Sequence, residues 1–464
     1  MFPDEIPAPR DEAQPADSDH TPVASAHSAR PAHLAVPTLW ARSLTQLADW
    51  FRHPSTVEER NVRNVLADSV GVGLATGVGS FLSVFLIRLG ATDFMVGLLT
   101  AMPALTGMFL SIPVGRFLSR QRQIVPWFSY SRFFVLSCYA LTGLVPFFLT
   151  RYRAEAILAI WAVATLPQTL VSVAFTVVMG AVAGPRGRFF LMSRRWSLLG
   201  FTNAVTALIV GQVLEMIAFP LNYQVVFLGA TIGGLISVYF SSHITLPDQE
   251  LPPSTSRDQP LHSRLRERLS EVAGNQTFTH FLVSQFIFRW GLMLPVPLIP
   301  IYWVRQLQAS DGWIGILNTV QSVVLLGAYF LWSRLSRRHG ERFVLLASTL
   351  GISLYPALTA VMPRVEPLVP LVALAGIFRA GMDLVFFDLA LATCPERESP
   401  YYIGIYQTTA FICSFLAPLL GTTLSASIGI ELALVIGTAL GLVGWLLMVL
   451  LHVGQDDPKA TPVR

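Results

Sequence analysis

Charged residues are scarce in this sequence, and lysine is nearly absent. Charged side chains make up 13% of the 464 residues, whereas a soluble domain carries about 25%. Lys459 is the only lysine, so almost all of the positive charge is arginine. Because 53% of the residues are hydrophobic, the composition excludes an ordinary soluble domain.

Cysteine is also rare, and the motifs of several protein classes are missing. Cys138, Cys394 and Cys413 lie within or at the end of apolar runs, so no disulfide framework is expected. No G-x-x-x-x-G-K-[ST] motif is present, which argues against ATP-driven work by this chain. No His/Cys spacing suits a metal, and we expect neither a metal nor a cofactor. The acidic N-terminus lacks the apolar core of a signal peptide, so no cleaved signal is expected.

Long apolar runs dominate the chain. Each is close to or above the ~20 residues with which a helix crosses ~30 Å of hydrocarbon. The sequence therefore predicts an all-α polytopic membrane protein with about twelve transmembrane helices. The runs cover residues 65–88, 94–114, 124–149, 156–183, 198–219, 223–246, 278–304, 313–333, 342–362, 367–392, 402–426 and 431–452.

The arginines predict how the chain is oriented in the membrane. Short loops that remain in the cytoplasm carry an excess of Lys and Arg. Clusters within residues 116–122, 186–195 and 334–342 all fall on one side of the predicted helices. The other side holds only Arg88, Arg151, Arg153, Arg305 and Arg364. We therefore expect a multi-pass protein of a bacterial inner membrane with both termini in the cytoplasm, and the formal net charge of +4 indicates this topology rather than a nucleic-acid partner.

An internal repeat divides the chain into two similar halves. Residues 89–99 and 307–317 share the pattern L-x-A-[TS]-D-x-x-[VI]-G-[LI]-L at an offset of 218 residues. Thr92–Asp93 and Ser310–Asp311 are expected to supply helix N-caps. Gly97 and Gly315 are expected to let a neighbouring helix approach closely.

We expect the repeat to organise the chain into five parts. These are a mostly disordered cytoplasmic tail (1–60), an N-terminal six-helix half (61–246), a cytoplasmic linker (247–275), a C-terminal six-helix half (276–452) and a cytoplasmic C-terminal tail (453–464). Parallel repeats related by an axis along the membrane normal place a binding site near the midplane, between the halves.

Twelve helices in two sets of six, a central cytoplasmic loop and arginine-rich loops after helices 2 and 8 resemble the major facilitator superfamily of secondary transporters. The resemblance covers about residues 60–452. The family's loop signature, G-x-x-x-D-[RK]-x-G-[RK], is matched in part at residues 115–122 and 333–342. Ser119 and Arg337 stand where the family has aspartate, so its charge-paired latch is not carried over. The candidates for an inner-loop gate are Gly115, Arg116, Arg120, Arg334, Arg338 and Gly340.

One predicted helix carries three charges within the apolar run 378–395. Arg379 lies near the bilayer centre, where an Arg or Asp costs ~2.5–3.5 kcal/mol. Arg379 and Asp383 are four residues apart, so they share a helix face and are expected to pair. Asp388 is turned away from Asp383 and lies nearer to the inner surface.

Arg289, in the run 278–304, lies at almost the same depth as Arg379. The resemblance implies a central cavity lined by helices 1, 4, 7 and 10, on which Arg289, Arg379 and Asp383 converge. Two arginines and one aspartate would give this cavity a net positive charge. Such a cavity favours an anionic group on the substrate, because arginine offers a planar fork to carboxylate or phosphate. A structural bridge without substrate contact is the alternative. The candidate substrate-binding residues are Arg289, Arg379, Asp383, Gln285, Gln168 and Trp290.

Three aspartates are candidates for proton coupling: Asp383, Asp388 and Asp68. A carboxylate that is buried when the site closes favours its protonated form, so it can take up a proton on one side and release it on the other. Asp383 is preferred for its depth. The alternative for Asp68 is an ion pair with Arg132, which lies at a similar depth.

The sequence favours a proton-coupled secondary transporter of a small molecule, with an organic anion as the expected substrate and a monomer in the lipid bilayer as the expected state. Efflux of drugs or amphipathic compounds by the same fold is the alternative, although residues 157–180 lack the arginine, and residues 197–216 the Gly-Pro pair, of the family's drug exporters. A membrane-embedded enzyme, a sensor and a lipid scramblase are further alternatives. We expect no enzyme activity, because Asp383 and Asp388 lie ~140° apart around a helix and no second acidic cluster is present.

Overall fold

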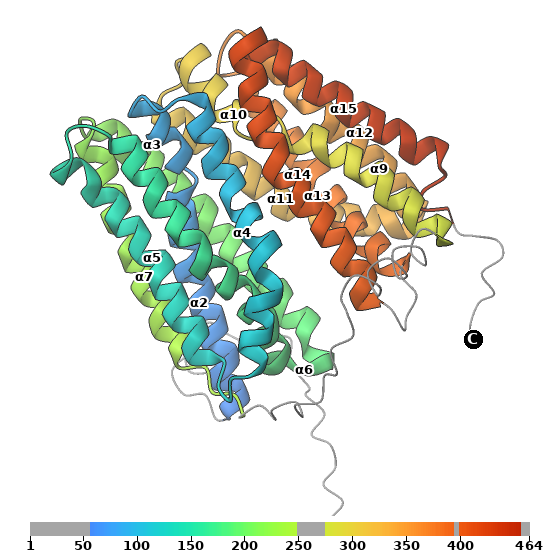
Figure 1. Cartoon of the computed structure of the whole chain (residues 1–464), viewed down its shortest axis with the longest axis horizontal. Helices are drawn as coiled ribbons and strands as arrows, with labels where there is room; N and C mark the ends of the chain where they lie inside the picture. Colours follow the sequence, from blue (N-terminus) through green and yellow to red (C-terminus); the bar gives the residue numbers. More distant parts are fainter. Residues whose placement is uncertain (1–55, 248–273, 394–398, 456–464) are drawn as a thin grey trace, which may run out of the picture. The chain divides into compact units, whose positions relative to one another are not determined.

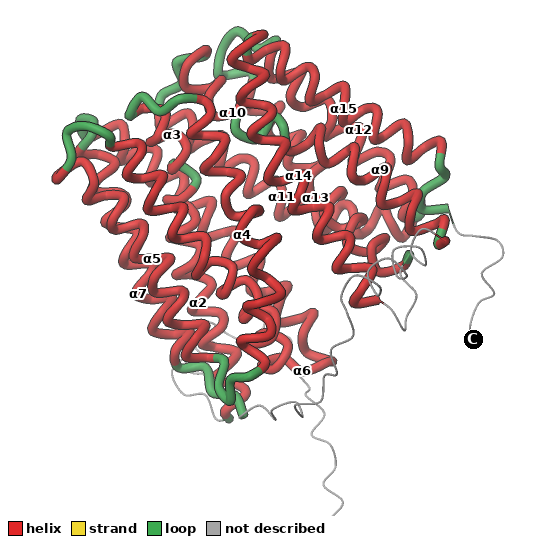
Figure 2. The backbone as a smooth tube through the Cα atoms, in the orientation of Figure 1, coloured by secondary structure: helices red, strands yellow, loops and turns green. Residues whose placement is uncertain are grey.

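The computed structural model describes residues 56–247, 274–393 and 399–455 (Figure 1). Within these ranges the chain consists of helices and loops, as Figure 2 shows, and it contains no strand. Most of the predicted N-terminal tail, the linker and the end of the C-terminal tail lie outside the described residues. Our predictions for those segments therefore remain predictions.

Twelve spans in the described chain are long and apolar enough to cross a membrane, which confirms the predicted fold class. The first half contains α2 (Val57–Gly79), α3 (Leu82–Arg88), α4 (Asp93–Ser119), α5 (Val125–Phe148), α6 (Arg153–Met216) and α7 (Leu221–Ser242). The second half contains α9 (Gln276–Met293), α10 (Leu298–Ile301), the π-helix η2 (Tyr302–Gln306), α11 (Asp311–His339), α12 (Glu341–Ala360), α13 (Leu368–Ala392), α14 (Ser399–Ile428) and α15 (Ile430–Leu450).

Helix α6 contains two of these spans, Arg153–Val182 and Leu191–Met216. Trp161, in the first span, donates a hydrogen bond to Thr142, close to the end of α5. Further along, the guanidinium of Arg195 lies 4.4 Å from the ring centre of Phe175. The chain therefore reverses direction within α6, and the two spans run antiparallel.

The seventh span, predicted over residues 278–304, is confirmed as a span but is interrupted along its length. Helix α9 ends at Met293, and a turn leads into α10 and η2. Pro295 and Pro297 explain the break, because proline lacks the backbone N–H that a helix interior needs and its ring clashes with the preceding turn. The three pieces together form the span Gln276–Gln306.

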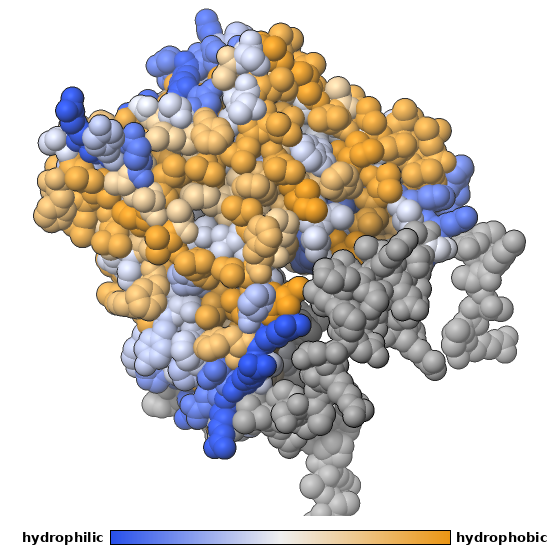
Figure 3. Space-filling model, viewed as in Figure 1, coloured by the Kyte–Doolittle hydropathy of each residue, from blue (hydrophilic) through white to orange (hydrophobic). Residues whose placement is uncertain are grey.

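Packing within each half leaves apolar side chains on the outside. In the first half α2 packs against α6 and α7, and in the second half α15 packs against α9 and α12. Figure 3 shows apolar residues covering the middle of the visible face. Large apolar side chains such as Phe109, Phe134 and Phe330 are more than 60% exposed. Such a surface suits contact with lipid tails.

Contacts between the halves join α6 to α11 and α4 to α14. We call the end of the helices at which α2 begins the predicted cytoplasmic end. The end at which α3 finishes is the predicted external end. These names carry the orientation expected from the loop arginines, which stays a prediction.

A buried ion cluster holds the first half together, toward the predicted cytoplasmic end of α2. Asp68 is 1% exposed, and one carboxylate oxygen accepts hydrogen bonds from Arg132 and from the Ser237 hydroxyl, the latter at 2.7 Å. The other oxygen lies 3.8 Å from the guanidinium of Arg195. The expected Asp68–Arg132 pair is confirmed, and Arg195 is an additional member that we did not predict.

The cluster contains two arginines and one carboxylate, so part of its positive charge needs other support. The Arg132 guanidinium lies 4.4 Å from the ring centre of Phe128, and Arg195 lies over Phe175 at the same distance. Aromatic faces attract such cations, and the attraction grows when water is excluded. Asp68 nevertheless supplies the only carboxylate that the described residues place within ion-pair distance of either arginine.

We expect Asp68→Asn to destabilise the protein strongly. It would leave two buried arginines without a carboxylate, and removing one partner of a buried pair costs about 3–5 kcal/mol. Thermal unfolding of the purified protein in detergent would measure this as a clear drop in Tm. Asp388→Asn is the matched control, because Asp388 is exposed. Equal Tm values for the two variants would contradict a structural role for the cluster.

Candidate functional site

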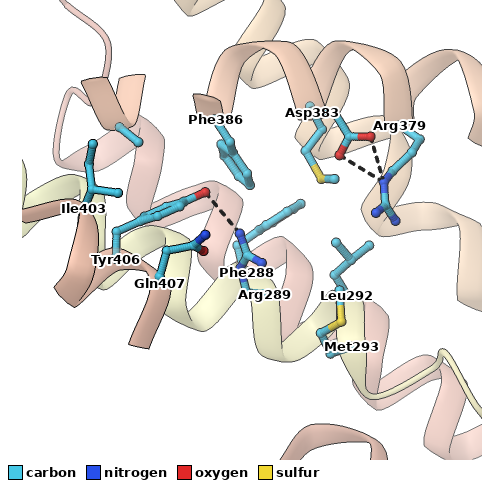
Figure 4. Close-up of a pocket in the computed structure, with 12 residues that line it drawn as sticks. Phe288, Arg289, Leu292, Met293, Arg379, Asp383, Phe386, Ile403, Tyr406 and Gln407 are labelled. Carbon is cyan, nitrogen blue, oxygen red and sulfur yellow. Dashed lines mark hydrogen bonds and ion pairs between the residues drawn. The ribbon is translucent and has the colours of Figure 1, made fainter. Parts of the chain in front are cut away.

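A cavity of about 330 Å³ opens among α9, α13 and α14 of the second half (Figure 4). Its size is that of a small-molecule site. Charged and polar side chains share the wall with apolar ones. The lining residues are Phe288, Arg289, Leu292, Met293, Arg379, Met382, Asp383, Phe386, Ala390, Ile403, Tyr406 and Gln407.

Helix α13 contributes an ion pair to the wall. The Nε of Arg379 donates to both carboxylate oxygens of Asp383, at 3.1 and 3.2 Å. This confirms the pairing expected from their spacing of four residues. The two side chains are 41% and 37% exposed, so the pair is open to the cavity. Figure 4 shows the terminal guanidinium nitrogens of Arg379 turned away from the carboxylate.

Helix α9 places Arg289 on another wall of the cavity, held by neutral groups. Its Nη2 donates to the Tyr406 hydroxyl at 3.1 Å. With the Gln285 amide oxygen turned toward the guanidinium, that oxygen accepts from Nη2 at 2.8 Å and from Nε at 2.6 Å. Gln285 is fully buried, so it fixes the arginine from behind. No carboxylate of the described residues lies within ion-pair distance of Arg289.

The cavity is therefore positively charged. Arg379 is neutralised by Asp383, but the described residues balance the charge of Arg289 with dipoles alone. A guanidinium in a site of low dielectric attracts a carboxylate or phosphate through charge-assisted hydrogen bonds. The arrangement suits an anionic group placed between the two arginines.

The individual apolar residues of the lining were not named from the sequence, although a signal for them exists. Side chains three or four positions apart lie on the same face of a helix. Leu292 and Met293 follow Arg289 by three and four residues, and Phe386 follows Asp383 by three. Placing the charges on helical faces would have identified these neighbours.

Other predicted site residues lie elsewhere. Gln285 supports Arg289 from outside the lining. Trp290 packs edge-on against Phe286 and does not line the cavity. Gln168 belongs to α6 in the first half, and this cavity is built from the second half alone. Asp388 is exposed and also lies outside the lining.

The candidate gate residues lie at the predicted cytoplasmic ends of α4 and α11. Gly340, with φ of +83°, ends α11 in a conformation that favours glycine. The four arginines are exposed, and none forms an ion pair with another described residue. They are Arg116, Arg120, Arg334 and Arg338. A gating role for these residues remains a prediction.

The exposure of the Arg379–Asp383 pair separates a site from a structural bridge. Exposed ion pairs contribute about 0–1 kcal/mol to stability, so we expect Asp383→Asn to change the free energy of unfolding by about 1 kcal/mol or less. The measurement is thermal unfolding beside the Asp68→Asn variant. If Asp383→Asn lowered Tm as much as Asp68→Asn, the pair would be a structural bridge.

Comparison with known proteins shows similarity to one family of transporters over part of the chain. The Major Facilitator Superfamily profile matches residues 281–464. The chain is 27% identical over 152 residues to Multidrug resistance protein MdtG of Proteus mirabilis. It is 26% identical over 165 residues to the Staphyloferrin B transporter of Staphylococcus aureus. These matches cover 32% and 35% of this chain, but only 37% and 39% of the relatives.

Solved structures share the fold across nearly the whole described chain. The nucleoside transporter NupG aligns with a TM-score of 0.66 at 11% identity, covering 85% of this chain and 100% of NupG. A bacterial homologue of the iron transporter ferroportin, solved in an inward-facing state, aligns with a TM-score of 0.63 at 13% identity. That alignment covers 88% of this chain and 99% of the homologue. The profile match and the shared fold agree with the repeated six-helix halves: residues 281–464 are similar to the Major Facilitator Superfamily, and the chain has the fold of the solved transporters.

Proposed function

We propose that this protein is a secondary transporter that moves a small organic anion by alternating access and is coupled to protons. The observation that carries the proposal is Arg289, a guanidinium on a cavity wall that has hydrogen-bonding partners but no carboxylate among the described residues. Two six-helix halves that rock about a site would expose it to one side of the membrane at a time.

The cost of arginine inside a membrane supports a ligand for Arg289. An arginine in the middle of a span costs ~2.5–3.5 kcal/mol on insertion scales. Where this chain uses arginine in the interior of the first half, it supplies the carboxylate of Asp68. Among the described residues, Arg289 has only the neutral Gln285 and Tyr406 as hydrogen-bonding partners. An anionic substrate would give Arg289 an anionic partner, as Asp68 does for Arg132 and Arg195.

The predicted orientation forms part of the proposal. The loop arginines support cytoplasmic termini, and the curated relatives come from bacteria. The cavity would then be reached from the cytoplasmic side when the external ends of the halves are in contact.

Asp383 is the proposed coupling residue. Its partner Arg379 also lines the cavity, so an entering anion would compete with Asp383 for the Arg379 guanidinium. Protonation of Asp383 would release Arg379 to the substrate, and loss of the substrate would restore the pair. Asp68 is less suited, because arginines and a hydroxyl already hold it away from the cavity. Asp388 does not line the cavity.

Efflux of an amphipathic compound is the second candidate. Phe288, Phe386 and Ile403 give the cavity an apolar side. MdtG, to which the chain is similar, is named a multidrug resistance protein. A cation or neutral drug would leave Arg289 unmatched, so the anion is preferred.

We expect purified protein in proteoliposomes to take up a labelled organic anion in a saturable manner. The panel should contain mono-, di- and tricarboxylates and organic phosphates, each with a neutral analogue. Arg289→Gln should reduce uptake at least tenfold, because a charge-assisted contact is worth about 1.5–3 kcal/mol. Arg151→Gln is the control, since it removes an exposed arginine that does not line the cavity.

Each outcome of the uptake experiment decides between the candidates. Anion uptake that falls in folded Arg289→Gln but not in Arg151→Gln supports the proposal. Transport of neutral or cationic compounds without anion transport would support drug efflux. Unchanged anion uptake by a folded Arg289→Gln variant would remove the role assigned to this residue.

A second prediction concerns coupling. Asp383→Asn cannot exchange a proton, so it should move the anion down its own gradient but lose accumulation driven by an imposed pH gradient. Asp388→Asn should keep that accumulation. The measurement is uptake with and without a pH gradient across the vesicle membrane. Accumulation that persists in Asp383→Asn would assign the proton to another group.

A further inference from the structure

The repeated motif L-x-A-[TS]-D does more than begin two helices. Thr92 and Ser310 are the caps, and their hydroxyls accept from the backbone N–H groups of Met95 and Trp313. The aspartates that follow them are not needed for capping. Each turns its carboxylate toward the other half of the protein, and each meets an arginine there.

The two arginine contacts are reciprocal. Arg88, at the end of α3, donates through Nη2 to Asp311 at 3.2 Å and to the carbonyl oxygen of Ala309 at 2.7 Å. Arg305, in η2, donates to Asp93 and, at 2.5 Å, to the carbonyl oxygen of Ala91. Ala91 and Ala309 occupy the same place in the repeat, as do the two aspartates. Each half therefore offers its motif to an arginine of the other.

We propose that Arg88, Asp93, Arg305 and Asp311 form a reciprocal clamp that closes the predicted external end and must break before the site opens there. This inference rests on the alternating access proposed above. The clamp lies where α3 contacts α10 and η2, at one end of the interface between the halves. It gives the repeated aspartates a purpose that helix capping alone does not.

The glycines of the motif serve the same interface. A Cβ added at Gly97 would lie 2.7 Å from the Thr422 hydroxyl, and one at Gly315 would lie 2.9 Å from the carbonyl oxygen of Ala207. Both neighbours belong to the opposite half, on α14 and α6. At the predicted cytoplasmic end of the same helices, a Cβ added at Gly115 or Gly404 meets nothing within 4 Å. The helices of the two halves therefore approach closely at the same end as the clamp.

The two sides of the clamp differ in strength. Asp311 also accepts from the Tyr223 hydroxyl at 2.8 Å, and its side chain is 10% exposed. Asp93 has a longer contact of 3.4 Å with Ser425 and is 17% exposed. More buried pairs are less screened by water. The Arg88–Asp311 side should therefore hold the halves together more firmly.

The test is the rate at which a membrane-impermeant maleimide, added to intact cells, modifies a cysteine introduced as Thr422→Cys. Thr422 is 1% exposed and lies under the clamp, against Gly97. Cys138 and Cys413 are buried, and the protein without Thr422→Cys measures any background labelling. The labelling requires neither a substrate nor transport.

We expect slow labelling in the parent protein and labelling about fivefold faster or more with Asp311→Asn, a typical size for a shift between two states. Asp93→Asn should have a smaller effect, and the double variant the largest. Arg364→Gln, which removes an exposed charge from the same end, should change nothing. Asparagine preserves the shape of the helix start, so folding should persist. Arg88→Gln, at a side chain that is 28% exposed, provides a second variant if Asp311→Asn misfolds.

Labelling that stays slow in folded Asp311→Asn, or that rises equally with Arg364→Gln, would overturn the clamp. The result is separate from the proposed transport of an anion. Faster labelling without anion uptake would uphold the clamp and remove the substrate class. Anion uptake with unchanged labelling would support the substrate class and overturn the clamp.

Discussion

A charge within the spans of this protein must find a partner, because hydrocarbon provides none. The chain meets this constraint in three ways. Asp68 is enclosed with Arg132 in the first half. The Arg88–Asp311 contact joins the two halves and can exist only while their ends meet. Arg289 is held by neutral groups at an open cavity. The first arrangement suits permanent structure, the second a contact that forms and breaks, and the third a ligand.

This division would explain how one fold combines stability with the proposed motion. An enclosed cluster would keep a half rigid, so that the half could move as a body. Contacts made from partly exposed side chains cost little to break, since water reaches the separated groups. The Arg379–Asp383 pair is of this kind, and so is the Arg305–Asp93 side of the reciprocal clamp. We propose that the substrate and the proton break the Arg379–Asp383 pair, and that the rocking of the halves breaks the clamp.

The sequence predicted features that depend on local spacing and missed those that depend on packing. The twelve spans follow from the length of the apolar runs, and the Arg379–Asp383 pair from a separation of four residues. The break in the seventh span was missed although Pro295 and Pro297 signalled it. Trp290 does not line the cavity because depth does not reveal the face of a helix, and Gln168 does not because the lining comes from the second half. The clamp joins Arg88 to Asp311, 223 residues apart, and no local pattern encodes that contact.

The central claim is that Arg289 binds an anion, and ligand-dependent stability tests it most directly. A ligand at one hundred times its Kd stabilises the folded state by about 2.7 kcal/mol, so Tm of the purified protein can be followed across a panel of organic anions and their neutral analogues. The account predicts that an anion raises Tm of the parent protein, that its neutral analogue does not, and that Arg289→Gln abolishes the rise. Stabilisation by the neutral analogue, or an undiminished rise in Arg289→Gln, would contradict it.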